Sequence, residues 1–244
     1  MKQNTIENQL LVEFNNAGVA RIHQESIVSL LLRLRKHDEA TFIHSVRVAL
    51  LSAKMARVLK IDPKPLLFAG CLHDIGKLYV PGELLRQKNY DPKTQPEIDK
   101  HILYSYEILK EIHPFSAEIA LMHHRFQTRK NKLTPDKLNP KISLSTRKKA
   151  TKISSLLAIA DQFNAATSRI RPDLGRSLTL SEAQKLLLKE FPKQRRVIKK
   201  LINSRVFSAE LPLTKPITPI IQNQRKKVIS TQKALKRSQV KRRH

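Results

Sequence analysis

The chain has 244 residues, which can bury one substantial core but would leave two full domains rather small. Its 47 Lys and Arg residues outnumber 20 Asp and Glu residues, and the net charge of +27 favours anionic partners such as nucleotides, nucleic acid or acidic lipid. Because no run of about 18 uncharged apolar residues and no export signal occurs, we expect no transmembrane segment and a cytoplasmic protein. The single cysteine, Cys71, excludes an internal disulfide and a thiolate zinc site.

The spacing of apolar residues is helical throughout, and with only 5 Gly and few alternating runs we predict an all-α protein. Residues 24–36 form the first clear helix, with one buried stripe at Ile27, Leu30, Leu31 and Leu34. Asp38 can cap the next helix, which should run to about Lys60. The inner face of that helix is predicted at Phe42, Val46, Ala49, Leu50 and Ala53, with His44 near its edge.

A short apolar helix is predicted to open at Pro65 and to end at the vicinal pair His73-Asp74, where Gly76 can break it. Residues 79–96 contain three prolines and indicate a long loop. The helical period resumes over residues 97–111, with His101 in the first turns.

Pro114 should start a further helix that ends at the pair His123-His124. Residues 125–152 hold ten Lys and Arg against one acid, which predicts a basic surface loop. Residues 153–169 form another apolar helix that carries Asp161. Since an unpaired buried carboxylate is costly, Asp161 should have a cation or strong hydrogen-bond donors beside it.

The segment Thr179–Glu182 has the pattern of a capping box for a helix over residues 182–191, and a basic helix to about Val206 follows. Residues 213–244 contain ten Lys and Arg and no acid, which predicts a disordered or partly helical basic tail. We expect this tail to bind polyanions, with nucleic acid as the favoured partner, although a solvated tail explains the same composition. The predicted divisions are an N-terminal extension, a folded domain and the tail, at residues 1–22, 23–210 and 211–244.

Seven potential metal ligands lie near the end or on the inner edge of separate predicted helices. Helices in a bundle can bring such residues to one point, and this number of ligands suits two metal ions that share one carboxylate. A two-metal site can activate water for the hydrolysis of a phosphoester. The seven residues are His44, His73, Asp74, His101, His123, His124 and Asp161.

Each of these residues also has a simpler interpretation. His44 and His101 could be half-exposed helix residues, the pair His123-His124 a cationic helix end, and Asp161 a partner for the basic loop. The metal site is favoured because all seven fall on inward apolar helices, whereas the other four histidines fall outside the pattern. Those four are His23, His37, His113 and His244.

In order and approximate spacing, these residues resemble the HD superfamily of metal-dependent phosphohydrolases, and most closely its HD-GYP subgroup. The resemblance spans residues 42–172. The strings that carry it are His44-Ser45-Val46-Arg47-Val48-Ala49, His73-Asp74-Ile75-Gly76-Lys77, Lys100-His101 with Tyr106-Glu107-Ile108-Leu109, His123-His124, and Ile159-Ala160-Asp161-Gln162-Phe163-Asn164-Ala165 with Arg169.

The resemblance implies an HD-type helical bundle over the folded domain and a centre of two divalent transition-metal ions, with iron or manganese favoured. It implies that one ion is held by His44, His73, Asp74 and Asp161, and the other by Asp74, His101, His123 and His124. It also implies two catalytic roles, in which Asp74 positions the attacking water and Lys77 holds the substrate phosphate.

The sequence departs from the subgroup after the paired histidines, where Arg125-Phe126-Gln127 stand instead of a Glu and the Gly-Tyr-Pro signature. Ala40 stands where some members have a Glu that supports a third metal, which favours two ions. Because about forty residues precede the match, we expect regulation by a partner protein, a homo-oligomer or ligand concentration rather than by a sensor domain.

The favoured function is a two-metal phosphodiesterase in signal transduction that hydrolyses a phosphoester of a nucleotide, with cyclic di-GMP as the favoured substrate. One alternative is a non-catalytic signalling or nucleic-acid-interaction module with the same fold. Another is an enzyme that acts on RNA or DNA and uses the tail as its anchor.

Overall fold

The computed structural model describes residues 6–87, 91, 93–126, 143–171 and 173–207, and all regular elements in this part of the chain are helical. The all-α prediction is therefore confirmed. The α-helices are α1 (Ile6–Asn16), α2 (Arg21–His37), α3 (Glu39–Leu59), α4 (Pro63–Leu72), α5 (Gly82–Leu85), α6 (Gln95–Asp99), α7 (His101–Leu109), α8 (Pro114–Met122), α9 (Leu144–Ser168), α10 (Leu180–Glu190) and α11 (Arg195–Asn203). Three short 3₁₀ segments are η1 (Ile75–Tyr79), η2 (His123–Phe126) and η3 (Pro192–Gln194).

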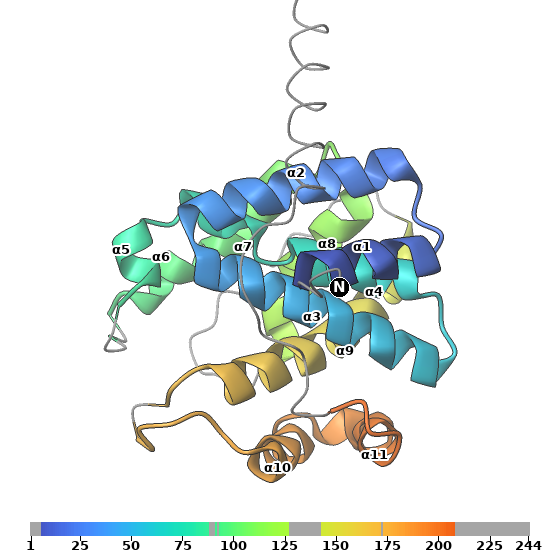
Figure 1. The fold of residues 1–244 in the computed structure, drawn as a ribbon, viewed down its shortest axis with the longest axis vertical. Helices are drawn as coiled ribbons and strands as arrows, with labels where there is room; N and C mark the ends of the chain where they lie inside the picture. The colour runs from blue at the N-terminus through green and yellow to red at the C-terminus, as the bar shows by residue number, and fades with distance from the viewer. Residues whose placement is uncertain (1–5, 88–90, 92, 127–142, 172, 208–244) are drawn as a thin grey trace, which may run out of the picture.

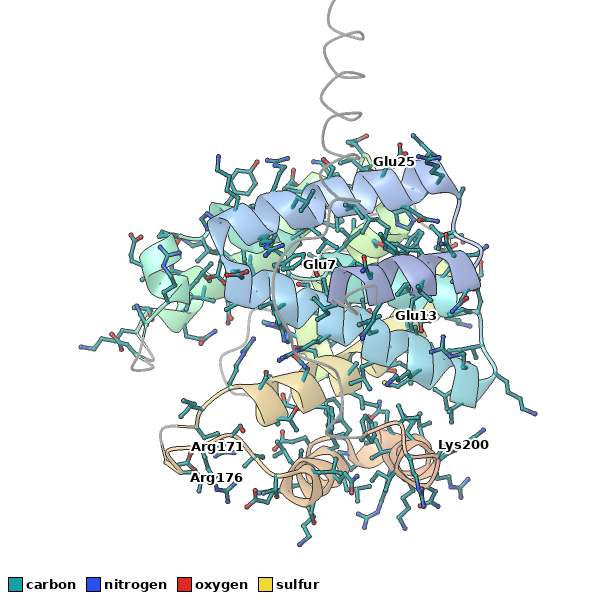
Figure 2. All side chains as sticks on the ribbon, viewed as in Figure 1. Glu7, Glu13, Glu25, Arg171, Arg176 and Lys200 are labelled. Carbon is teal, nitrogen blue, oxygen red and sulfur yellow. The ribbon has the colours of Figure 1, made fainter. Side chains whose placement is uncertain are left out.

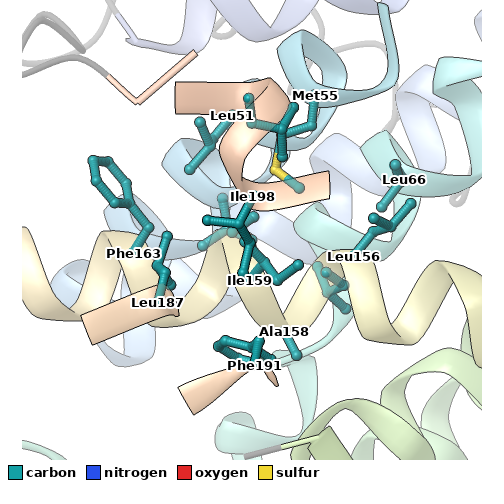
Figure 3. Close-up of a cluster of buried hydrophobic side chains, with 14 of the residues drawn as sticks. Leu51, Met55, Leu66, Leu156, Ala158, Ile159, Phe163, Leu187, Phe191 and Ile198 are labelled. Carbon is teal, nitrogen blue, oxygen red and sulfur yellow. The ribbon is translucent and has the colours of Figure 1, made fainter. Parts of the chain in front are cut away.

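Helix α3 lies at the centre of the bundle, with α2 on one side and α9, α10 and α11 on the other (Figure 1). One apolar cluster joins α3 and α4 to the C-terminal helices, through residues such as Leu51, Met55, Ile159 and Ile198 (Figure 3). A second cluster joins α3 and α4 to α1, α2, α7 and α8. Because α3 is buried on both sides, it holds the two halves of the core together.

The start of α3 follows from the predicted cap, since the Asp38 carboxylate accepts a hydrogen bond from the Thr41 N–H at 2.8 Å. The five residues predicted for its inner face are all buried. A Cβ at Gly70 of α4 would clash with the Ala49 backbone, so α3 and α4 approach each other more closely than larger residues would permit.

Three segments differ from the sequence prediction. The loop predicted over residues 79–96 contains α5 and the first two residues of α6. The single helix predicted over residues 97–111 is broken at Lys100 into α6 and α7. Of the loop predicted over residues 125–152, residues 127–142 lie outside the described chain, but Leu144–Lys152 forms the first turns of α9. The Ser143 hydroxyl caps that helix by accepting from the Thr146 N–H at 3.2 Å.

The sequence pattern did not predict the turns of α9 before residue 153, because few apolar residues repeat there at the helical period. Lys and Arg have good helix propensity even where few apolar residues mark the period. One such residue, Ala150, is fully buried in the first apolar cluster and packs these turns against the bundle.

The capping box of α10 is confirmed, because the Thr179 hydroxyl accepts from the Glu182 N–H and the Glu182 carboxylate accepts from the Thr179 N–H at 2.8 Å. The basic tail predicted for residues 211–244 lies outside the described chain. Among the described helices, none is both long and apolar enough to cross a membrane.

Candidate metal centre

The seven predicted ligands come from five separate places along the chain and meet inside the bundle. His44 lies on α3, Asp161 lies on α9, and the other five stand at helix ends. All seven are buried. Donor atoms lie within 4.8 Å of one another in three overlapping groups, which are His44 with His73 and Asp161, His73 with Asp74 and His123, and His101 with His123 and His124.

Three of the histidines are oriented by a hydrogen bond to a nearby backbone carbonyl. The Nδ1 atoms of His73, His101 and His123 lie 3.0, 2.6 and 2.6 Å from the carbonyl oxygens of the residues three positions earlier. A carbonyl oxygen can only accept, so each Nδ1 donates and each neutral ring presents an Nε2 lone pair to the centre. A helix end leaves such carbonyls without an intrahelical partner, which explains why the ligands stand at helix ends.

His44 is oriented by a residue from another helix. Its Nδ1 lies 2.8 Å from the side-chain oxygen of Asn164, which is one helical turn beyond Asp161 on α9. Asn164 is buried and has no role in the sequence prediction, although its spacing of three residues from Asp161 places both on one helix face. The same face of α9 thus supplies a ligand candidate and the residue that orients another.

The Asp74 carboxylate lies between two groups of histidines, with His73 and His44 in one and His101 in the other. Its Oδ1 lies 3.1 Å from Nε2 of His101, while its Oδ2 lies 3.5 Å from Nε2 of His73 and 3.8 Å from Nε2 of His44. The Lys77 ammonium donates to the same Oδ2 at 2.6 Å. One carboxylate therefore faces both groups with different oxygen atoms.

The buried surroundings favour ionised carboxylates at Asp74 and Asp161 and neutral rings at His73 and His123. Burial raises the pKa of Asp74, but Lys77 and the nearby histidines outweigh it and hold that pKa well below its usual range. Burial likewise raises the pKa of Asp161, and His44 at 3.0 Å more than reverses the effect. Burial, with neighbouring histidines, lowers the pKa of His123 to about 3. At neutral pH the centre therefore offers the carboxylates of Asp74 and Asp161 and the Nε2 lone pairs of His73 and His123.

These donors fit divalent cations. Within the described chain, the buried Nε2 atoms of His73 and His123 have no hydrogen-bond partner. The Nε2 lone pair of His101 faces a carboxylate oxygen, and two acceptors at 3.1 Å need a proton or a cation between them. Imidazole and carboxylate together are the ligands that iron, manganese and related ions take in proteins.

Gly76 and Ser105 hold the turn that carries Asp74 and were not predicted to act together. The Gly76 N–H donates to the Ser105 hydroxyl at 2.8 Å, and that hydroxyl donates to the His73 carbonyl at 3.0 Å. A Cβ at Gly76 would clash with the backbone of His101 and Ser105. Gly76 was expected to break a helix, but it lies within η1, and the close approach of α7 is what requires a glycine.

The chain is similar in sequence to a known protein over part of its length. A protein of Pseudomonas aeruginosa named cyclic di-GMP phosphodiesterase is 36% identical over 124 residues, which are 47% of this chain and 29% of that protein. The chain thus spans less than a third of the length of this curated relative.

The structure is similar to the HD domain of the phosphodiesterase PgpH from L. monocytogenes, solved in complex with cyclic di-AMP. The TM-score is 0.51 at 21% identity, over 72% of this chain and 94% of that one. For a second structure of the same domain, the TM-score is 0.47 at 21% identity, over 84% of this chain and 98% of that one. The first likeness shows that the two proteins share a fold.

The family model described as HD domain matches residues 41–166. This range includes all seven buried residues of the candidate metal centre, from His44 to Asp161. It also includes most of α3 and α9 and all of the helices between them. The chain belongs to the HD domain family.

Proposed function

We propose that this protein is a metal-dependent phosphodiesterase that binds two divalent transition-metal ions, iron or manganese, and hydrolyses a phosphoester of a cyclic dinucleotide. The observation that carries the proposal is the position of Asp74, whose two oxygen atoms face different groups of buried histidines. A shared carboxylate of this kind is what a two-metal site requires.

In this proposal the ligands divide as the resemblance implies. One ion is held by His44, His73, Asp74 and Asp161, and the other by Asp74, His101, His123 and His124. When bound, the ions supply a more acidic water and neutralise the charge on the phosphate oxygens. The carbonyl contacts at Nδ1 keep the rings in place, so their Nε2 atoms need no rearrangement to bind an ion.

Lys77 is proposed to hold a phosphate oxygen of the substrate. Its side chain is 11% exposed, and its ammonium lies 2.6 Å from Asp74 Oδ2. It is therefore placed at the edge of the centre by the same turn that carries Asp74. A cation bound at Asp74 would compete for that oxygen and leave the ammonium available to an anion.

Cyclic di-GMP is the first substrate to test, because the named activity of the curated relative concerns it and the chain carries a net charge of +27. Protein loaded with Mn²⁺ or Fe²⁺ is incubated with cyclic di-GMP, cyclic di-AMP, nucleoside triphosphates and a generic phosphodiester. We expect a linear dinucleotide product with the wild type and none with Asp74→Asn, which keeps the size of the side chain. No turnover of any compound by metal-loaded wild type would refute the catalytic proposal.

A non-catalytic binding module is the second candidate, in signalling or at nucleic acid. It is favoured by the residue after the histidine pair, where Arg125 adds a cation in place of the acid found in the HD-GYP subgroup. Cyclic dinucleotide binding in a calorimetric titration, with no product after prolonged incubation, would support this candidate.

A further inference from the structure

Helix α11 and the residues on either side of it carry six exposed cations that have no role in the metal centre. We call Lys193, Arg195, Arg196, Lys199, Lys200 and Arg205 the α11 cationic face. All six are exposed, and residues 192–207 contain no acid. Lys200 lies at the right-hand edge of α11 in Figure 2.

The helical period places these cations together. At 3.6 residues per turn, Arg195, Lys199, Arg196 and Lys200 fall in this order on one arc of about 140°. The opposite side of α11 carries Ile198 and Leu201, which are fully buried in the apolar cluster with α9 and α10. The helix is thus anchored by its apolar side and holds its cations outward in a fixed arrangement.

This arrangement weakens the helix that carries it. Arg195 and Arg196 occupy the first turn, which contains no acid, although the positive end of a helix dipole favours acidic residues there. Arg195 and Lys199 are like charges four residues apart, as are Arg196 and Lys200, and such pairs destabilise a helix.

The neighbouring helix shows the opposite pattern. Helix α10 follows the rules for a stable helix, with Glu182 in its first turn and Lys189 in its last. Among the residues that the structure describes, no cation of the α11 face forms an ion pair with a carboxylate. Features that break local rules without internal compensation indicate a function that lies outside the helix.

We propose that the α11 cationic face binds the phosphate backbone of double-stranded nucleic acid, independently of sequence. Cations on a rigid surface can neutralise several phosphates and release their counterions, and a helix N-terminus adds backbone donors for an anion. A single strand fits less well, because binding it relies on exposed aromatic residues, and Phe191 and Phe207 beside this helix are both buried. A lipid surface also fits less well, because Ile198 and Leu201 are used in the core and cannot insert.

The test uses the full chain, so that the tail is present in every variant. The test variant carries Arg195→Gln, Arg196→Gln, Lys199→Gln and Lys200→Gln. The matched control carries Arg33→Gln, Lys36→Gln, Lys60→Gln and Lys64→Gln, four exposed cations elsewhere, and has the same net charge. Circular dichroism and thermal melting check that both variants fold.

Binding to a fluorescent 20-base-pair duplex is titrated at several salt concentrations. For the test variant we expect at least a tenfold loss of affinity at low salt. The slope of log K against log salt should become shallower by about 3–4, since each phosphate contact contributes about 0.9. The control should bind as the wild type does.

Three results would overturn the proposal. Equal duplex binding by the wild type, the test variant and the control would show that α11 does not contact the duplex. Equal losses in test and control would assign the binding to net charge alone. A loss that is confined to anionic vesicles, with duplex binding unchanged, would assign the surface to membranes.

Discussion

The hydroxyl of Ser105 accepts a hydrogen bond from the backbone N–H of Gly76 at 2.8 Å and so ties α7 to the turn that carries Asp74. The same oxygen donates to the His73 carbonyl at 3.0 Å. One fully buried hydroxyl therefore satisfies backbone groups on both sides of Asp74. We infer that Ser105 is a positioning residue for the centre.

Ser105→Ala should destabilise the protein by about 1–3 kcal/mol, because it leaves a buried N–H and a buried carbonyl without this partner. It should also weaken Mn²⁺ binding, since Asp74 is then less firmly placed. Urea denaturation and a metal titration measure the two effects. Ser52→Ala is the control, because the buried Ser52 hydroxyl has no hydrogen-bond partner in the described chain. If the two variants behave alike, Ser105 has no positioning role.

Gly76→Ala should lower the free energy of unfolding by about 3 kcal/mol. The added Cβ would clash with the backbone of His101 and Ser105, which cannot move aside easily. Gly82→Ala is the matched control, since a Cβ there meets only the end of the flexible Arg86 side chain. Denaturant unfolding of both variants compares them. A Gly76→Ala protein as stable as the control would show that α7 can shift to make room.

Asp74→Ala should lose both metal ions, because Asp74 faces both groups of histidines, whereas His101→Ala should lose mainly one. Elemental analysis after purification with added iron or manganese gives the metal content per chain. His37→Ala is the control, because its ring contacts the Val80 carbonyl rather than the centre. Only trace metal in the wild type would remove the two-metal proposal.

Lys77→Ala should leave the metal content unchanged and lower turnover of any substrate found, because it removes a phosphate contact but no ligand. The variant also removes the cation that contributes most to lowering the pKa of Asp74, so that pKa should rise toward its usual value in the metal-free protein. Steady-state kinetics measure the turnover, and elemental analysis measures the metal content. Lys36→Ala is an exposed control. Unchanged turnover would exclude the phosphate-binding role.

The Cys71 thiol should not react in the native protein. It is fully buried, and burial raises the pKa of the thiol far above its ordinary value, so the nucleophilic thiolate is absent at pH 8. A chromogenic disulfide reagent should modify less than a tenth of the native protein in the time that it modifies all of the unfolded protein. Fast modification of native protein would show that α4 opens readily.

Local sequence patterns are enough to predict the helical class, several helix boundaries and buried residues such as those on the inner face of α3. Period and capping chemistry are local, so the Asp38 cap and the Thr179 capping box could be predicted without a fold. The same holds for the candidate ligands, since a histidine that follows an apolar helix can orient itself on the carbonyl three residues earlier. Such a contact depends only on the residues of one turn.

Contacts between segments that are distant in the sequence depend on tertiary packing and could not be predicted from local patterns. Ser105 and Gly76 are 29 residues apart, and His44 and Asn164 are 120 apart, so no local pattern marks either pair. The break at Lys100 and the early start of α9 also depend on packing, because exposed charged turns carry little apolar periodicity to reveal them. Residue types could suggest which side chains bind metal, but the packing of α3, α7 and α9 determined which neighbours hold those side chains in place.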